Sequence, residues 1–148
     1  MTSYVLDAGV AVKWFLPASA EPLSREAMGL LERYTKGQYS FLVPDLFFAE
    51  FGNVLWKAER YGRCSRRATD AAIAEITKSG FASFPSSELL HAAVQIARAY
   101  ERTVYDSLYV ALAVQVKSYL ITADEKLANA LAGRLPVLWL GAIYSTTQ

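Results

Sequence analysis

Short runs of consecutive apolar residues alternate along this chain with longer segments that have helical spacing. Buried strands of parallel sheets have this short apolar form, and their alternation with helices is typical of parallel α/β folds. The sequence therefore predicts an α/β fold in which a parallel β-sheet is flanked by helices on both faces. The predicted strands are residues 4–6, 41–43, 81–84, 119–121 and 137–140, and the predicted helices are residues 21–34, 45–61, 65–78, 87–100, 103–117 and 127–131.

Length and composition indicate one globular domain over residues 1–148. The chain is 53% hydrophobic and 20% charged, which supports a sizeable core and argues against disorder. Its single cysteine, Cys64, excludes an internal disulfide and suits a reducing compartment. The apolar N-terminus contains Asp7 and Lys13, unlike a signal peptide, and the longest apolar run is far below the roughly 20 residues of a membrane span. We therefore expect a soluble, cytoplasmic protein that has no membrane partner.

Four acidic residues occur at the ends of predicted strands or at the beginnings of predicted helices. Asp7 directly follows the first strand, and Asp124 comes three residues after the fourth. Asp106 heads the most apolar helix, and Glu50 lies in the first turns of the helix after the second strand. Ligands of open parallel sheets bind beyond the carboxyl ends of the strands. We therefore expect the four carboxylates to converge on one edge of the sheet.

Each aspartate also has a purely structural interpretation. Asp7 could cap a short helix after the first strand, and Asp124 could cap the helix that follows it. Asp106 is the acid of a Thr103-x-x-Asp106 sequence that resembles a capping box, and an acid in a first turn interacts favourably with the helix dipole. For any one of these aspartates, the sequence does not distinguish a helix-capping role from a catalytic role.

Glu50 is harder to explain as a structural residue. Its helical neighbours include Leu46, Phe47 and Val54, which indicates a buried face, and no Lys or Arg lies three or four positions away. A buried carboxylate without a partner is costly and is usually neutralised, paired or bound to metal. Asn53, one turn further along, could donate a hydrogen bond to it.

A cluster of these carboxylates requires a compensating cation. Two carboxylates about 4 Å apart repel by roughly 4 kcal/mol at an effective dielectric constant of 20. Sites made only of carboxylate oxygens suit Mg²⁺ or Mn²⁺ better than Zn²⁺. One or two such ions would activate water for in-line attack on a phosphodiester.

Four motifs in order give the chain a family resemblance. They are Val5-Leu6-Asp7, PDLFFAEFGNVL at residues 44–55, YDSLYVALA at residues 105–113, and LITADEKLA at residues 120–128. Together they resemble the PIN domain, in the VapC-like toxin branch of type II toxin–antitoxin systems, from about residue 3 to residue 141. The resemblance implies a Mg²⁺- or Mn²⁺-dependent endoribonuclease that is paired with a small antitoxin.

The resemblance also implies roles for individual residues. Asp7, Glu50, Asp106 and Asp124 correspond to the metal-site acids, with Asp7 and Asp106 as the most direct ligands. Asn53 and Thr122 would contact the ligands rather than the metal. Gly9 departs from the family pattern, which often has Ser or Thr two residues after the first Asp, so a hydroxyl contact there is in doubt.

Basic residues concentrate in one predicted helical hairpin. Lys57, Arg60, Arg63, Arg66 and Arg67 are opposed there only by Glu59. The cluster is either a solvated face or a surface that contacts RNA phosphates, and for the second case we name Arg63, Arg66 and Arg67. Each of the three tryptophans could stack on bases or fill the core.

Large apolar side chains near two of the motifs lead us to predict a homodimer with a hydrophobic groove for an antitoxin segment. These side chains are Trp14, Phe15, Phe47, Phe48 and Phe51. The single histidine, His91, has no second histidine to form a metal site with it.

The function predicted from the sequence is cleavage of RNA by a metal-dependent toxin. One alternative keeps the fold and assigns RNA processing or DNA cleavage without a toxin role. Another is a receiver-like signalling module. Such a module would have paired acids just before the first-strand Asp, and residues 3–6 contain none. Nucleotide-cofactor chemistry has no support, because the chain has neither a Walker A loop nor a G-x-G-x-x-G sequence.

Overall fold

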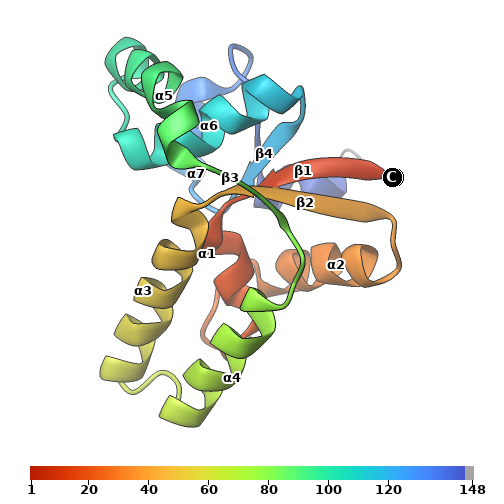
Figure 1. Cartoon of the computed structure of the whole chain (residues 1–148). Coiled ribbons are helices and arrows are strands. Elements are labelled where there is room, and N and C mark those ends of the chain that lie inside the picture. The colour runs from red at the N-terminus through yellow and green to blue at the C-terminus, as the bar shows by residue number, and fades with distance from the viewer. Residues whose placement is uncertain (146–148) are drawn as a thin grey trace.

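The computed structural model describes residues 1–145 and is built around a parallel sheet in the order β3-β2-β1-β4-β5 (Figure 1). Val5 of the central strand pairs with Leu42 on one side and with Leu120 on the other. This confirms the predicted parallel sheet. The strands are β1 Thr2–Leu6, β2 Tyr39–Pro44, β3 Ala82–Phe84, β4 Tyr119–Thr122 and β5 Val137–Trp139.

Helices cover both faces of the sheet, as predicted. Figure 1 shows α1 to α4 below the sheet, with α5 and α6 above it. The α7 helix connects β4 to β5 and packs against both strands. The helices are α1 Ala8–Ala11, α2 Ser24–Thr35, α3 Leu46–Arg60, α4 Arg66–Thr77, α5 Ser86–Tyr100, α6 Val104–Val116 and α7 Glu125–Leu131, with 3₁₀ helices η1 Val12–Trp14 and η2 Leu140–Ser145.

The most apolar helix, α6, lies at the centre of the upper layer. It packs against β1, β2 and β4 on one side and against α5 on the other, so residues 107–113 are all buried. A helix with almost no polar face is stable only when it is enclosed in this way. Its first turn therefore projects the only acid of the helix, Asp106, toward the carboxyl edge of the sheet.

Aromatic side chains fill the lower layer and include the five residues that suggested an exposed groove. Phe47 and Phe51 of α3 are almost completely buried, while Trp14, Phe15 and Phe48 pack against the same core. The Trp14 indole donates to the Ala27 carbonyl at 2.8 Å. The premise that these five side chains need a partner to bury them is therefore wrong, and the homodimer remains a prediction without that support.

Asp45 occupies the N-cap position of α3, where the sequence Pro44-Asp45 ahead of a helix predicts a cap. Its side chain, however, accepts no hydrogen bond from that helix. It accepts instead from the backbone N–H of Ser86, at 3.0 Å, and from the Ser86 hydroxyl. Because the Asp45 N–H also bonds to the Phe84 carbonyl, the two strand ends lie together, and the Asp45 side chain binds the first residue of α5 instead of an N–H of α3.

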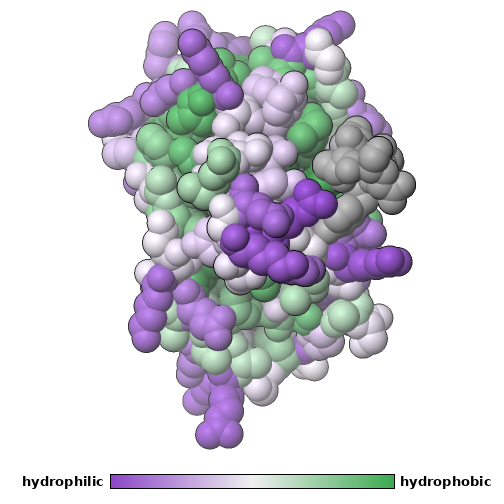
Figure 2. All heavy atoms as spheres, turned by 90° about the vertical axis from the view of Figure 1, so that its right-hand side faces the viewer, coloured by the Kyte–Doolittle hydropathy of each residue, from purple (hydrophilic) through white to green (hydrophobic). Residues whose placement is uncertain are grey.

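Figure 2 shows the surface on the α2 side of the molecule, where hydrophilic and hydrophobic residues are interspersed. Within residues 1–145, no helix combines the length and the hydrophobicity that crossing a membrane requires.

Candidate active site

Asp7 lies where β1 ends between β2 and β4. Its carboxylate accepts a hydrogen bond from the Gly9 N–H at 3.2 Å, which caps α1, and one from the Thr122 hydroxyl at 2.7 Å. Burial raises the pKa of Asp7 to about 6, and the charges of Glu50 and Asp106 act in the same direction. The two hydrogen bonds oppose the shift without cancelling it. Asp7 is therefore both a helix cap and the partly buried centre of an acidic group.

Thr122 joins two of the acids. Its hydroxyl donates to Asp7 and accepts from the backbone N–H of Asp124 at 3.1 Å. Thr122 is completely buried at the end of β4, so this hydroxyl has a fixed position. The hydroxyl thereby holds one Asp7 oxygen in place, and the role of Thr122 beside a metal ligand stays a prediction.

Asp106 reaches the site from the first turn of α6. The Thr103 hydroxyl accepts from the Asp106 N–H at 3.0 Å, as in a capping box. Burial nevertheless raises the pKa of the Asp106 carboxyl, and the charge of Asp124 raises it further, against the lowering effect of Thr103 and Arg102. Ionised Asp106 is thus less stable here than in water, which a cap alone does not explain.

Asp124 is the most exposed of the four acids. Its carboxylate accepts from the Leu127 N–H at 3.1 Å and caps α7, as its structural interpretation predicted. Its charge still contributes to the raised pKa of Asp106. Asp124 therefore lies at the rim of the acidic group.

Glu50 enters the site from the second turn of α3. Burial raises the pKa of its carboxyl, and the Asp106 charge adds to the shift. No hydrogen bond connects Glu50 to Asn53 within the described residues, and Asn53 is exposed. The predicted support of Glu50 by Asn53 is therefore not seen.

Tyr109 is a residue of the site that the sequence analysis missed. It lies one turn after Asp106 on α6, is 3% exposed, and its hydroxyl is near enough to Glu50 that each alters the pKa of the other. The raised pKa of Tyr109 keeps the phenol protonated, so it is a hydrogen-bond donor beside carboxylates. Within residues 1–145, neither its hydroxyl nor Glu50 Oε1 has a hydrogen-bond partner of standard geometry. The i, i+3 spacing from Asp106 was the available signal.

The donor set suits a hard divalent cation. Three carboxylates have pKa values raised by burial and by one another, and one of them retains a buried oxygen without a partner. Clustered carboxylate oxygens favour Mg²⁺ or Mn²⁺. In the described part of the chain, however, no three Asp, Glu, His or Cys side chains are close enough together to share an ion.

The PIN domain family model matches residues 4–131, which include all four acids, Thr122 and Tyr109. The chain belongs to the PIN domain family. No curated protein is significantly similar to it in sequence.

Solved structures share the PIN fold at low sequence identity. A toxin–antitoxin complex from Klebsiella pneumoniae is 20% identical with a TM-score of 0.60, covering 91% of this chain and 95% of that chain. A protein from Pyrobaculum aerophilum is 20% identical with a TM-score of 0.66, covering 97% and 88%. VapBC2 from Rickettsia felis, bound to a promoter DNA fragment, is 13% identical with a TM-score of 0.61, covering 93% and 98%. At these identities the similarity establishes the fold.

The basic hairpin lies beyond the acids, at the far end of α3. Arg63 is held by an ion pair with Glu21 at 2.7 Å, whereas Arg66 and Arg67 are exposed at the start of α4. Arg63 is thus occupied by a structural contact, and the two other arginines remain the better candidates for binding phosphates.

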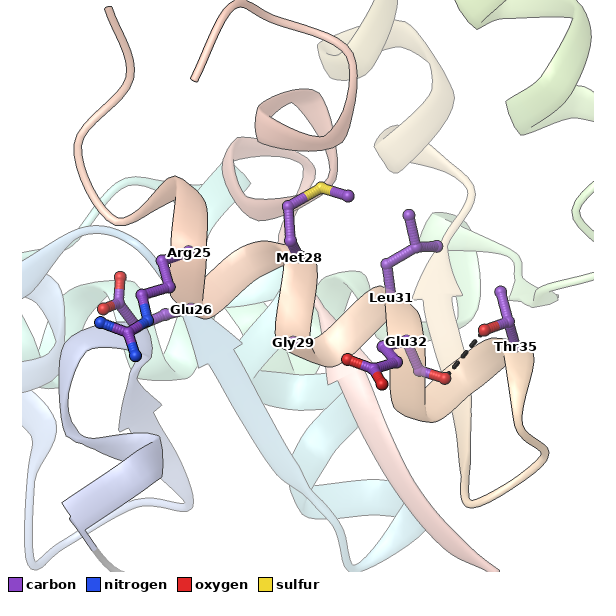
Figure 3. Close-up of a pocket in the computed structure, with 7 residues that line it drawn as sticks. All are labelled: Arg25, Glu26, Met28, Gly29, Leu31, Glu32 and Thr35. Atoms are coloured by element: carbon purple, nitrogen blue, oxygen red, sulfur yellow. Dashed lines mark hydrogen bonds between the residues drawn. The ribbon is translucent and has the colours of Figure 1, made fainter. Parts of the chain in front are cut away.

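A hollow of about 800 Å³ along α2 does not belong to the acidic site. All the residues that line it come from α2 itself (Figure 3), and Met28 and Leu31 project from the same side of the helix. None of the four acids contributes to it.

Proposed function

We propose that this PIN domain is a metal-dependent endoribonuclease and the toxin of a toxin–antitoxin pair. The observation that supports it most directly is the group of carboxylates with raised pKa values at the carboxyl edge of the sheet. Bound Mg²⁺ or Mn²⁺ would neutralise this charge, activate water and stabilise charge on the scissile phosphate.

The side chains would have different roles in such a site. Asp7, Asp106 and Asp124 would hold the metal. Thr122 fixes one oxygen of Asp7, and the Gly9 N–H binds the other. The unpaired Oε1 of Glu50 is available to orient the attacking water and to accept its proton.

The decisive experiment compares purified wild type, Asp7→Asn and Asp106→Asn on structured RNAs, with Mn²⁺ and with EDTA. We expect cleavage only with metal and a loss of more than about 100-fold in each variant, beyond the 10- to 100-fold that loss of an outer contact usually causes. Asp70→Asn, on the exposed surface of α4, is the matched control and should cleave normally. Near-normal cleavage by either site variant would contradict the ligand assignment.

The toxin role has its own test. Several structural neighbours come from toxin–antitoxin complexes, which supports a small antitoxin as the partner of this chain. Expression of the wild type alone should arrest growth, and expression of Asp7→Asn should not. Cleavage in vitro without growth arrest would favour RNA processing, and a preference for DNA substrates would favour DNA cleavage. The receiver-like alternative has no support in a PIN domain.

A further inference from the structure

The α3 helix links the acidic site to the basic hairpin by one continuous exposed face. Its buried positions, Phe47, Phe51, Leu55 and Ala58, all face the core. On the other side, Asn53, Trp56, Lys57 and Arg60 are exposed, and Glu50 lies at the border near the first of them. At 1.5 Å per residue, Arg60 lies about 15 Å along the helix axis from Glu50. Any chain leaving the acids along α3 would pass these side chains in turn.

Trp56 is an unusual side chain to leave in solvent. It is 50% exposed, and the Arg60 guanidinium lies over its ring at 5.5 Å from the centroid. By contrast, Trp14 packs against Phe41 and Phe81 in the core. The cation–π contact orients the Trp56 ring and leaves half of the residue accessible. Trp56 is therefore a preformed flat platform rather than a packing residue.

The charge around this platform is strongly positive. Lys57 and Arg60 are on α3, Arg66 and Arg67 begin α4, and all four are exposed. Tyr61, which follows Arg60 at the end of α3, is 75% exposed and adds a second aromatic ring. Aromatic rings interleaved with basic side chains are the typical composition of surfaces that bind single-stranded nucleic acid, because bases stack and phosphates pair with cations.

We propose that the exposed face of α3 binds a single-stranded segment of the RNA substrate next to the cleavage site, with one base stacked on Trp56 and phosphates on Lys57 and Arg60. The inference rests on the proposed function. A single strand is required because a paired base does not offer its face to a side chain. An acidic peptide also complements the charge, but the continuity of this face with the phosphodiester site favours RNA.

The test measures binding of a fluorescent single-stranded oligonucleotide in EDTA, where cleavage does not interfere. Trp56→Ala should weaken binding about 10-fold, the fold-change that stacking of one base corresponds to, while Trp56→Phe should retain most of the affinity. Tyr119→Ala is the matched control, because Tyr119 is 51% exposed at the opposite end of a strand. Binding of duplex RNA should be almost insensitive to Trp56→Ala.

Two further measurements separate the possible outcomes. Lys57→Gln should reduce the salt dependence of binding, and Trp56→Ala should leave that slope unchanged because it removes no charge. Unaltered single-strand affinity in Trp56→Ala would overturn the inference and leave the endoribonuclease proposal standing. If the wild type binds no RNA at all, both the RNA-binding face and the endoribonuclease proposal are contradicted. The exposed face of α3 would then be assigned to a protein partner.

Discussion

Two groups of charged side chains in this protein differ in how their acids are neutralised. In the first, the Glu21 carboxylate lies between Lys13, at 3.7 Å, and Arg63, at 2.7 Å, and the Lys13 ammonium also donates to the Pro22 carbonyl. In the second, Asp7, Glu50 and Asp106 each have carboxylate neighbours that raise their pKa values, and the one base that acts on them, Arg102 beside Asp106, does not cancel the shift. The fold can therefore neutralise a buried acid with protein cations where it needs only stability.

That difference makes the acidic site a place where charge lowers stability in the absence of a cation. The Glu21 group ties the loop after η1 to the hairpin tip of α3 and α4 across 42 positions in the sequence. The acids connect the ends of β1 and β4 and the starts of α3 and α6, so their repulsion acts on the elements that define the site. We interpret the contrast as the separation of a structural ion cluster from a functional one.

Neutralising Glu21 should have the largest effect on stability. Glu21→Gln leaves the Lys13 ammonium buried with only a carbonyl partner, and removing one partner of a buried pair costs about 3 kcal/mol. Urea unfolding should show this loss in the free energy of unfolding. The matched control is Glu32→Gln, which removes an exposed pair with Lys36 and should leave the unfolding midpoint unchanged. Equal effects of the two substitutions would remove the distinction between the charge groups.

Neutralising Asp7 should instead raise the free energy of unfolding in EDTA. Because its pKa is about 6 in the folded protein and near 3.8 in the unfolded chain, the unfolded chain loses its proton first. Stability therefore falls as the pH rises from about 4 to about 6 and then stays level, a loss of about 3 kcal/mol. Asp7→Asn does not titrate, so it should exceed wild type by about 1 to 2 kcal/mol at pH 8 after the weaker hydrogen bonds are deducted.

The measurement is the difference in free energy of unfolding between Asp7→Asn and wild type at pH 4 and at pH 8. The difference should be near zero or negative at pH 4, where both side chains are uncharged in the folded protein. A variant that is less stable than wild type at pH 8 would show that Asp7 acts only as a cap of α1.

The sequence was sufficient for the sheet and for the positions of the acids. Consecutive apolar runs specify buried parallel strands, and parallel strands place the residues that follow them on one edge. The sequence did not predict which side chains of different elements contact one another. Asp45 is the N-cap residue of α3, and the pairing of β2 with β3 brings its side chain to the first N–H of α5 instead. The spacing of Tyr109 from Asp106 places both on one side of α6, but it does not show that the Tyr109 hydroxyl lies beside Glu50 on α3.

Removing the Tyr109 hydroxyl should show whether Tyr109 holds Glu50 in position or only packs in the core. Tyr109→Phe keeps the ring in the core and deletes a buried donor without a standard partner, so the stability in EDTA should change by less than about 1 kcal/mol. If the hydroxyl holds Glu50 toward the metal, Mn²⁺ affinity should fall about 10-fold, as for other residues that contact a ligand. Thermal unfolding across a Mn²⁺ titration measures both quantities. An unchanged Mn²⁺ midpoint would leave Tyr109 as a packing residue.

The smallest expected change in stability distinguishes a cap from a ligand at Asp106. If the carboxylate only assists the capping box, Asp106→Asn should lower stability by a few tenths to about 1 kcal/mol, and Mn²⁺ should stabilise the variant as much as it stabilises wild type. If the carboxylate belongs to the acidic site, its raised pKa means that the uncharged side chain is favoured. Asp106→Asn should then be equal or higher in stability in EDTA.

Metal makes this difference measurable. Wild type should gain stability with Mn²⁺ by mass action, and Asp106→Asn should gain much less. Because the hydrogen bond from the Asp106 N–H to the Thr103 hydroxyl does not involve the substituted carboxyl group, the capping geometry survives in the variant. Urea unfolding of both proteins, in EDTA and in millimolar Mn²⁺, gives four free energies. A variant that is weaker in EDTA and gains as much from Mn²⁺ as wild type does would make Asp106 a cap, and the three remaining acids would then have to hold the metal without it.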